Sequence, residues 1–382
     1  MNFAFTETQQ LIRETARKFA EEKLAPGSVE RDENEIFPRE ALQELGALGF
    51  MGMMVPEEWG GAGFDTISYV LAVEEISRVD ASVGVIMSVN NSLVCFGINK
   101  YGSAHQKEVF LRDLASGKKL GAFALSEPEA GSDASNQHTI AVRDGDSYVL
   151  NGTKNWITNG STADVVLVMA ATDRSKGAKG ISTFIVEKGV PGFVVAKKEK
   201  KLGIRSSDTV SLSFQDCRVP ALNRIGEEGQ GFSFAMKTLE GGRIGIAAQA
   251  LGIAQACLDA SVGYAKQRKA FDRPIAELQA IQFKLSEMAA NTEAARWLVL
   301  QAASLKDADS PFGKQAAMAK LFASKVAVQS ALEAIQVHGG YGYVREYLVE
   351  RYLRDAKITE IYEGTSEIQR IVISRALLKS ET

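Results

Sequence analysis

The chain has 382 residues, of which 45% are hydrophobic, enough for a sizeable core shared by two or three domains. Its 44 basic and 47 acidic residues give a formal net charge of -3, which argues against a protein that binds nucleic acid or an anionic membrane surface. The first residues lack the basic and apolar regions of a secretory signal. No run of about 18 apolar residues is present, so we expect no segment that spans a membrane.

Cysteine and histidine are sparse. Cys95, Cys217 and Cys257 are far apart and odd in number, which favours free thiols in a reducing compartment over a disulfide framework. The three histidines are scattered, and no cysteine or histidine spacing resembles a zinc site. We therefore expect no structural metal.

The first third of the chain is predicted to be helical. Thr6 and Gln9 have the spacing of a capping box, which would begin a helix that Pro26 ends. Helical periodicity returns over residues 38–50 and 66–78. The first domain is therefore expected over residues 1–120.

The hydrophobic period changes near residue 121. Asp144-Gly145 lies between two short apolar runs, as in a β-hairpin. Further strands are predicted at Val165–Ala170, Ile181–Val186, Phe193–Val195 and Thr209–Phe214. Helical patterns resume after Gly231 and continue to the end of the chain. We expect a β domain over residues 121–230 and a helical bundle over residues 231–382.

Two common nucleotide-binding motifs are missing. The sequence contains no G-x-G-x-x-G between a strand and a helix, and no G-x-x-x-x-G-K-[ST]. A dinucleotide bound here would therefore not use a Rossmann crevice.

The segment Ala124-Leu-Ser-Glu-Pro-Glu-Ala-Gly-Ser-Asp133 follows a predicted strand and contains the residues of a tight turn. Such a turn can direct backbone N–H groups and hydroxyls at an anion. Judged alone, an ordinary polar loop explains it equally well.

A second candidate segment is Trp156-Ile-Thr158. An indole has a flat apolar face, and the threonine hydroxyl can donate a hydrogen bond to a ring nitrogen. A core tryptophan beside a strand threonine is the simpler interpretation when the segment is taken alone.

The third candidate is Gln336-Val-His-Gly-Gly-Tyr-Gly-Tyr343, followed by Glu346, Arg351 and Asp355. Adjacent glycines allow a ligand to approach the backbone closely. A helix that ends in a glycine turn would look the same.

The fourth candidate is Ile361-Tyr-Glu-Gly-Thr-Ser-Glu-Ile-Gln-Arg370. Ser366 and Gln369 have capping-box spacing, so a helix is predicted to begin there and Glu363 to lie just before it. An acidic residue in that place can simply interact with the helix dipole. The glycine that follows Glu363 leaves room for a substrate.

Together these four segments resemble the acyl-CoA dehydrogenase family, and the resemblance extends from the first helix to the last. It implies an α+β fold with a helical N-terminal domain, a β-barrel-like middle domain and a C-terminal four-helix bundle. It also implies FAD as cofactor and a homotetramer, in which part of each FAD site comes from a neighbouring subunit. The cofactor-binding positions implied by the resemblance are Leu125, Ser126, Trp156, Ile157, Thr158, Arg268, Phe271, Gln279, Gln336, Gly339, Gly340, Thr365 and Glu367.

The resemblance implies that Glu363 is the catalytic base. It would remove the Cα proton of an acyl-CoA while the Cβ hydrogen leaves as hydride to the flavin, giving a trans-2-enoyl-CoA. The implied electron acceptor is an electron-transferring flavoprotein. Substrate contacts are implied for Ser132, Glu240, Arg243 and Gly364. Some relatives carry the base immediately before the arginine that matches Arg243, where this chain has Gly242.

The resemblance is strongest to the short-chain, butyryl-CoA members of fatty acid β-oxidation, through Ser88–Leu93 and Gly242–Ala247. Branched short-chain substrates, isobutyryl- and 2-methylbutyryl-CoA, are the main alternative. An acyl-CoA oxidase is disfavoured because those chains are generally longer. A non-catalytic assembly factor is disfavoured because Glu363, Thr158 and Ser132 are all retained. The expected compartment is the bacterial cytoplasm, or the mitochondrial matrix for a processed eukaryotic chain.

Overall fold

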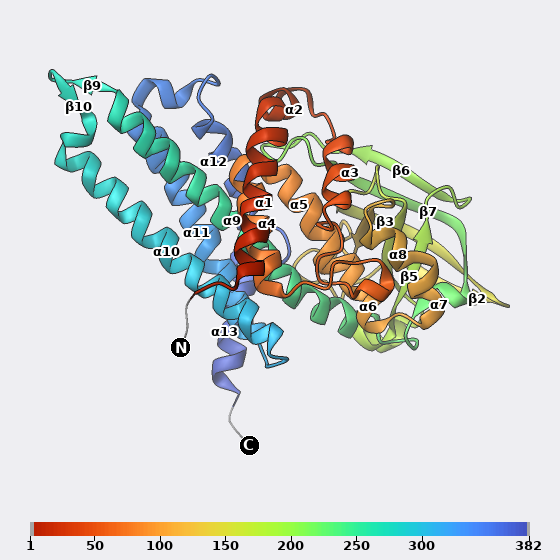
Figure 1. Cartoon of the computed structure of the whole chain (residues 1–382). Coiled ribbons are helices and arrows are strands. Elements are labelled where there is room, and N and C mark those ends of the chain that lie inside the picture. Colours follow the sequence, from red (N-terminus) through yellow and green to blue (C-terminus); the bar gives the residue numbers. More distant parts are fainter. Residues whose placement is uncertain (1–3, 380–382) are drawn as a thin grey trace.

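A computed structural model describes residues 4–379, with helices at both ends of the chain and a β-sheet between them (Figure 1). The first helices are short, and α1 and α5 both pack against α4. Their bounds are α1 Glu7–Phe19, α2 Ser28–Asn34, α3 Arg39–Ala47, α4 Thr66–Val79, α5 Ala81–Ser88, α6 Phe96–Tyr101, α7 Ala104–Gln106 and α8 Arg112–Ala115.

The predicted capping box is confirmed at the start of α1. The Gln9 backbone N–H donates to the Thr6 hydroxyl at 3.2 Å, and the Thr6 N–H donates to the Gln9 side chain at 3.0 Å. The prediction that Pro26 ends this helix is wrong. The α-helix ends earlier, at Phe19, and π- and 3₁₀-helical turns lead into α2. Pro26 is tolerated because it lies in the first turn of the 3₁₀ segment, where its missing N–H has no helical partner.

The middle of the chain forms one eight-stranded sheet in the order β6-β7-β3-β2-β4-β5-β8, with β1 paired to β4. The hairpin signal is confirmed, because Asp144 pairs with Ser147 across a turn at Gly145-Asp146. The strands are β1 Gly121–Ala124, β2 Ile140–Asp144, β3 Ser147–Thr158, β4 Val165–Ala171, β5 Ile181–Glu187, β6 Phe193–Lys198, β7 Thr209–Pro220 and β8 Arg224–Ile225.

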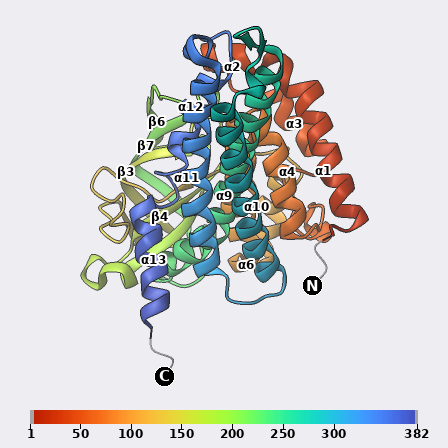
Figure 2. The ribbon, with the colours of Figure 1, turned by 90° about the vertical axis from the view of Figure 1, so that its left-hand side faces the viewer.

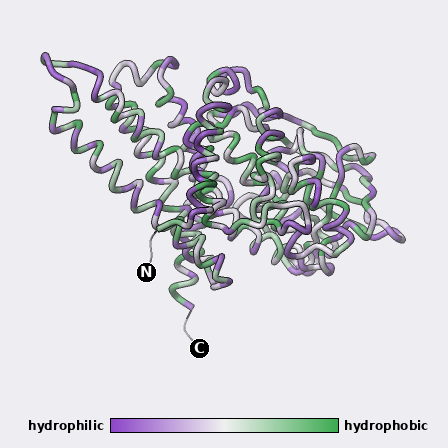
Figure 3. The backbone as a smooth tube through the Cα atoms, in the orientation of Figure 1, coloured by the Kyte–Doolittle hydropathy of each residue, from purple (hydrophilic) through white to green (hydrophobic). Residues whose placement is uncertain are grey.

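Long helices follow the sheet, and α9, α10 and α11 run side by side (Figure 2). Buried residues of α10 recur at Met288, Thr292, Ala295 and Val299, which is a helical period. Figure 3 accordingly shows hydrophilic and hydrophobic residues alternating along it. The elements are α9 Gly231–Gln267, β9 Lys269–Ala270, β10 Arg273–Pro274, α10 Gln279–Asp307, α11 Gly313–His338, α12 Val349–Ile358 and α13 Ser366–Leu378.

Within the described residues 4–379, two helical stretches are long and apolar enough to cross a membrane by composition alone. They are Ala81–Tyr101, with a mean hydropathy of 1.6, and α9, with a mean hydropathy of 1.2. Other parts of the protein bury 94% and 78% of their apolar windows, respectively. Their apolar character is therefore satisfied by the protein core.

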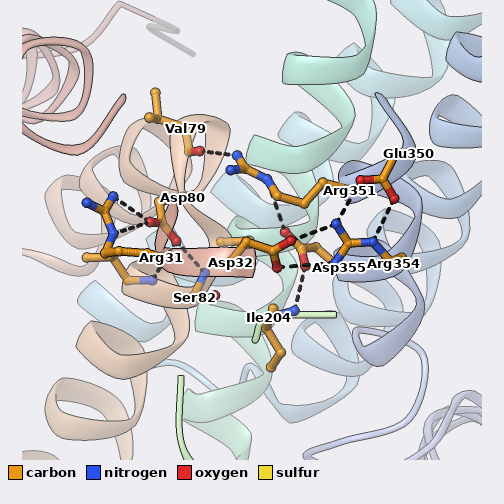
Figure 4. A network of polar contacts seen from close by, with 12 residues as sticks. Arg31, Asp32, Val79, Asp80, Ser82, Ile204, Glu350, Arg351, Arg354 and Asp355 are labelled. Carbon is orange, nitrogen blue, oxygen red and sulfur yellow. Dashed lines mark hydrogen bonds and ion pairs between the residues drawn. The ribbon is translucent and has the colours of Figure 1, made fainter. Parts of the chain in front are cut away.

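An ionic network joins the three parts of the chain (Figure 4). From α12, Arg351 donates to the Val79 carbonyl at 2.7 Å, and Arg354 pairs with Asp32 at 2.7 Å. Asp355 accepts the backbone N–H of Ile204, which belongs to the loop before β7. Arg351 and Asp355, singled out in the sequence beside the glycine turn, thus fasten α12 to the helical and β parts.

A buried ion pair supports the loop after β1. Lys154 on β3 and Glu127 in the loop lie 2.6 Å apart, and both side chains are almost completely inaccessible to solvent. Glu127 also accepts the backbone N–H groups of His138 and Thr139. Separating buried charges is expensive, so this pair fixes the loop against the strand.

We expect Glu127→Gln to lower the free energy of unfolding by roughly 3–5 kcal/mol, because it leaves the Lys154 ammonium buried without a carboxylate. Thermal unfolding of the purified protein measures this. Glu129→Gln changes an exposed residue of the same loop and should stay within about 0.5 kcal/mol of wild type. Equal unfolding temperatures for the two variants would contradict the proposed support.

Candidate active site

Glu363 lies in the turn between α12 and α13 in an uncommon backbone conformation. Its φ is 50°, in the left-handed region, and Gly364 follows with a φ of 93°. A left-handed glutamate costs about 1–2 kcal/mol, so surrounding contacts must hold it. The predicted cap is displaced by one residue: α13 begins at Ser366, and the Thr365 hydroxyl accepts the Ile368 N–H.

The Glu363 carboxylate is inaccessible to solvent. Among residues 4–379, neither of its oxygens has a hydrogen-bond partner. Across from it lies Gly242 of α9, where a Cβ would collide with Glu363 Oε2 and would lie 2.7 Å from Leu93 Cδ2. Glycine at position 242 therefore leaves the space into which the carboxylate points.

Burial raises the pKa of Glu363 to about 7, although Lys320 and then Arg243 oppose the shift. Desolvation therefore outweighs the opposing charges of both cations. A carboxyl with this pKa is substantially ionised at neutral pH, yet it is a stronger base than an exposed glutamate.

Hydroxyl groups lie on the α4 and α5 side of this space. Tyr69 donates to the Ser88 hydroxyl at 2.9 Å, and a Cβ at Gly245 would collide with both side chains. Tyr362 donates to Gln249, whose amide donates to the Ala81 carbonyl at 2.7 Å. Burial is the main cause of the raised pKa of Tyr69, and the negative charge of Glu363 adds to it.

The candidate flavin residues of the middle domain come together in the structure. The Asn155 N–H donates to the Ser126 carbonyl at 2.9 Å, which joins the loop at 124–133 to β3. Leu125 is buried, whereas Ser126 and Thr158 are partly exposed. Ile157 is 2% exposed and faces the sheet core.

Trp156 is 63% exposed, which excludes the simpler interpretation of a core tryptophan. The register between β3 and β7 shifts between Lys154 and Ile157, and Trp156 sits in this bulge with a φ of 62°. A β-bulge redirects a side chain. It turns the indole outward beside the loop at 124–133.

The remaining candidate cofactor residues lie far from Trp156 in the same chain. Arg268, Phe271 and Gln279 surround the β9–β10 hairpin, at the opposite end of the molecule from β3 (Figure 1). Phe271 is 85% exposed. A cavity of about 560 Å³ is lined by Arg268, Gly339 and Gly340, among others. Gln336 lies nearby, in the last turn of α11. One chain thus presents two groups of candidate cofactor residues that lie far apart.

The candidate substrate residues lie on several elements. Ser132 is exposed in the loop, and Gly364 directly follows Glu363. Arg243 is 6% exposed on α9, and burial lowers its pKa. Glu240 is directed toward Gly313, where a Cβ would lie 2.9 Å from Glu240 Oε1. Of the two remaining cofactor candidates, Thr365 caps α13, and Glu367 is exposed and pairs with Arg370 at 3.3 Å.

The residues present fit a flavin dinucleotide. An outward indole beside partly exposed hydroxyls suits a flat ring with polar edges, and the cavity beside Arg268 suits the charged, aromatic end of a dinucleotide.

The cysteines are free and buried, as predicted. No group of three or more potential metal ligands occurs within residues 4–379.

The contacts that Lys320, Gln369, Tyr69 and Ser88 make around Glu363 were not predicted from the sequence. Lys320 has no exposed surface and donates to the Gly364 carbonyl at 2.8 Å. A lysine in the otherwise small and apolar run Ala316-Ala-Met-Ala-Lys-Leu-Phe-Ala323 was the available signal. No comparable sequence pattern marks the hydrogen-bonded hydroxyls of Tyr69 and Ser88.

The buried charge of Glu363 should make folding stability depend on pH. The pKa of Glu363 is about 7 in the folded protein, above the ordinary 4.5. Ionisation of this buried carboxyl therefore lowers the free energy of unfolding increasingly from pH 4.5 to about pH 7, and by a constant amount at higher pH. Glu363→Gln should therefore stabilise the protein by up to about 3 kcal/mol at pH 8 and not at pH 4.5. Thermal unfolding at both values measures the difference, and a variant less stable at pH 8 would contradict it.

Comparison with known proteins agrees with this geometry. Three family models of acyl-CoA dehydrogenases together match most of the chain: the N-terminal domain at residues 6–118, the middle domain at 122–217 and the C-terminal domain at 229–378. The mitochondrial short-chain specific acyl-CoA dehydrogenase of Mus musculus is 55% identical over 374 residues, which are 98% of this chain and 91% of the relative. The short-chain specific enzyme of Clostridium acetobutylicum is 50% identical over 99% of this chain and 100% of its own.

Solved structures are equally similar. Butyryl-CoA dehydrogenase from Megasphaera elsdenii superposes with a TM-score of 0.98, is 51% identical, and the match covers 99% of this chain and 100% of the other. A chain in a structure described as the electron transferring flavoprotein of Acidaminococcus fermentans has a TM-score of 0.99 and 52% identity, with both chains covered completely. The chain belongs to the acyl-CoA dehydrogenase family, and it is an FAD-dependent oxidoreductase that acts on CH–CH groups.

Proposed function

We propose that this protein dehydrogenates a short, uncharged acyl-CoA such as butyryl-CoA to the trans-2-enoyl-CoA, with Glu363 as the base. The supporting observation is the Glu363 carboxylate, buried and without a hydrogen-bond partner in the described part of the chain, opposite the space that Gly242 leaves. A general base must be unencumbered and within reach of the proton that it removes.

Glu363 takes the Cα proton of the thioester, and the Cβ hydrogen leaves with its electron pair. Bound FAD supplies the acceptor for that hydride. Negative charge develops on the thioester oxygen as the Cα proton departs, so donors near this oxygen lower the barrier. The second place where relatives carry the base is occupied here by Gly242, which has no side chain that could accept a proton.

We assign the flavin ring to Leu125, Ser126, Trp156, Ile157 and Thr158, and the adenosine end to Arg268, Phe271, Gln279, Gln336, Gly339 and Gly340 of a neighbouring subunit. The separation of the two groups within one chain supports this division (Figure 1). It requires at least a dimer, and we propose the homotetramer of the family. Thr365 and Glu367 complete the cofactor contacts, and Ser132, Glu240, Arg243 and Gly364 contact the acyl-CoA.

A short acyl chain is supported by relatives described as short-chain specific at 50–55% identity. The glutaryl-CoA dehydrogenase structure is only 35% identical. The family resemblance matches Gly84 to an arginine of the glutaryl enzymes, and a glycine supplies no cation. A buried distal carboxylate would therefore lack a cationic partner at this position, which is costly.

We further propose an electron-transferring flavoprotein as the acceptor. This chain superposes with a TM-score of 0.99 on a chain in the structure described as the electron transferring flavoprotein of Acidaminococcus fermentans, which supports this partner. An oxidase would instead pass its electrons to oxygen, so turnover that requires a dye or flavoprotein under air separates the two activities. The compartment stays a prediction, since the relatives include mitochondrial and bacterial proteins.

Replacing the base tests the chemistry directly. Glu363→Gln keeps the side-chain size but cannot accept a proton, so kcat with butyryl-CoA and a dye acceptor should fall ~10²–10⁴-fold while FAD stays bound. Glu360→Gln is the matched control, because Glu360 lies in the same turn and pairs with Lys357 at 2.6 Å. Near-normal turnover of Glu363→Gln would place the base elsewhere.

The acyl preference can be measured as kcat/KM across butyryl-, hexanoyl-, octanoyl-, isobutyryl- and glutaryl-CoA. We expect a maximum at butyryl-CoA and a modest decline at hexanoyl-CoA, since one methylene in an apolar pocket changes binding by only ~1–3 kcal/mol. A maximum at octanoyl- or glutaryl-CoA would overturn the short-chain assignment. A maximum at isobutyryl-CoA would keep the chemistry and indicate a branched-chain enzyme.

A further inference from the structure

The turn that carries Glu363 is held by two buried donors. Lys320 Nζ, from α11, and Gln369 Nε2, from the first turn of α13, each donate to the Gly364 carbonyl at 2.8 Å. Gln369 also donates to the Glu363 carbonyl at 3.4 Å. Both side chains have no exposed surface. Two helices therefore fix the carbonyl immediately after a left-handed glutamate.

A lysine is an unusual choice for this contact. A neutral donor, as Gln369 shows, satisfies a carbonyl without the cost of burying a charge. Within residues 4–379, Lys320 forms no ion pair with a carboxylate. Its charge is therefore not balanced by a contact partner, and Glu363 is the carboxylate that acts on it most strongly.

The charged groups around the pair come from several helices. Lys320 interacts with Glu363, Glu360 and Glu367, and with the cation Arg243 of α9. Glu363 is opposed by Lys320 first and Arg243 second. Tyr69 and Tyr362 lie close enough to Glu363 for its charge to raise their pKa values. Of these groups, Lys320 combines a charge effect on Glu363 with a direct hydrogen bond to its turn.

We propose that Lys320 is a positioning residue for the dehydrogenation, which holds the Glu363–Gly364 turn through the Gly364 carbonyl and keeps the base ionised with its charge. The inference rests on the proposed role of Glu363. It goes beyond that role because it assigns two separable effects to one side chain outside the substrate space. Gln369 shares the first effect and has no charge for the second.

The two effects predict different variants. Lys320→Met removes the donor and the charge, so kcat should fall by up to ~10²-fold, as a misplaced reacting group typically causes. At low pH, kcat/KM falls because Glu363 is protonated and only its carboxylate form is active. This acid limb of the pH profile therefore reports the pKa of Glu363. Without the cation its pKa rises, and the limb should move to higher pH by roughly half a pH unit or more.

Gln369→Leu removes only a neutral donor, so kcat should fall while the acid limb stays in place. Lys320→Arg keeps the cation and should retain the wild-type limb. Lys325→Met, an exposed lysine of the same helix, is the control and should match wild type in rate and limb. FAD content and unfolding temperature verify that each variant is folded.

If Lys320→Met does not retain FAD, Lys320→Gln keeps a donor for the carbonyl and carries the same prediction for the acid limb. A folded, FAD-loaded Lys320→Met or Lys320→Gln enzyme with an unmoved limb overturns this inference alone. A wild-type protein without turnover on any acyl-CoA overturns the proposed function as well. If the acid side of the kcat/KM profile also moved in Gln369→Leu, the two effects of Lys320 would not be separable. The pH shift would then come from the geometry of the turn and not from the charge of Lys320.

Discussion

The site depends on a carboxylate that is buried with no hydrogen-bond partner among residues 4–379. An ionised Glu363 in this environment opposes folding, and its left-handed backbone adds strain. Both costs must be offset by packing elsewhere. The hydrogen bonds from Lys320 and Gln369 hold the turn, and α12, just before it, is fastened by Arg351, Arg354 and Asp355.

Small residues of α9 create the space beside the Glu363 carboxylate. Gly242 faces the carboxylate, Gly245 lies against the Tyr69 and Ser88 hydroxyls, and Gly252 approaches the backbone of α4. Glycine inside a helix lowers its intrinsic stability by roughly 1 kcal/mol relative to alanine. In α9 the glycines allow close packing against α4 and α5. The helix is buried along most of its length, so this packing can offset the loss. The same helix therefore forms the core and leaves room for chemistry.

The fold separates cofactor candidates that the sequence alone groups together. The loop at 124–133 and the Trp156 bulge lie on the β part, while the β9–β10 hairpin lies at the far end of the helical bundle (Figure 1). If one FAD contacts both groups, it must lie between subunits. Assembly would then complete the site, and a loss of quaternary structure would impair cofactor binding before the fold itself failed.

The sequence by itself determined the succession of helices, strands and helices and the free cysteines, and it singled out Glu363 as the candidate base, because periodicity, turn residues and the Glu363 string are local patterns. Only the tertiary structure placed Gly242 opposite Glu363, since these residues are distant in the chain and meet through the packing of α9 against the last turn. It also decided the cap at Thr365, the outward Trp156 and the buried Lys320, because a bulge register and a desolvated charge depend on neighbours that no local window contains. The pKa of Glu363 is the clearest case, since burial, which the sequence does not record, outweighs every nearby charge.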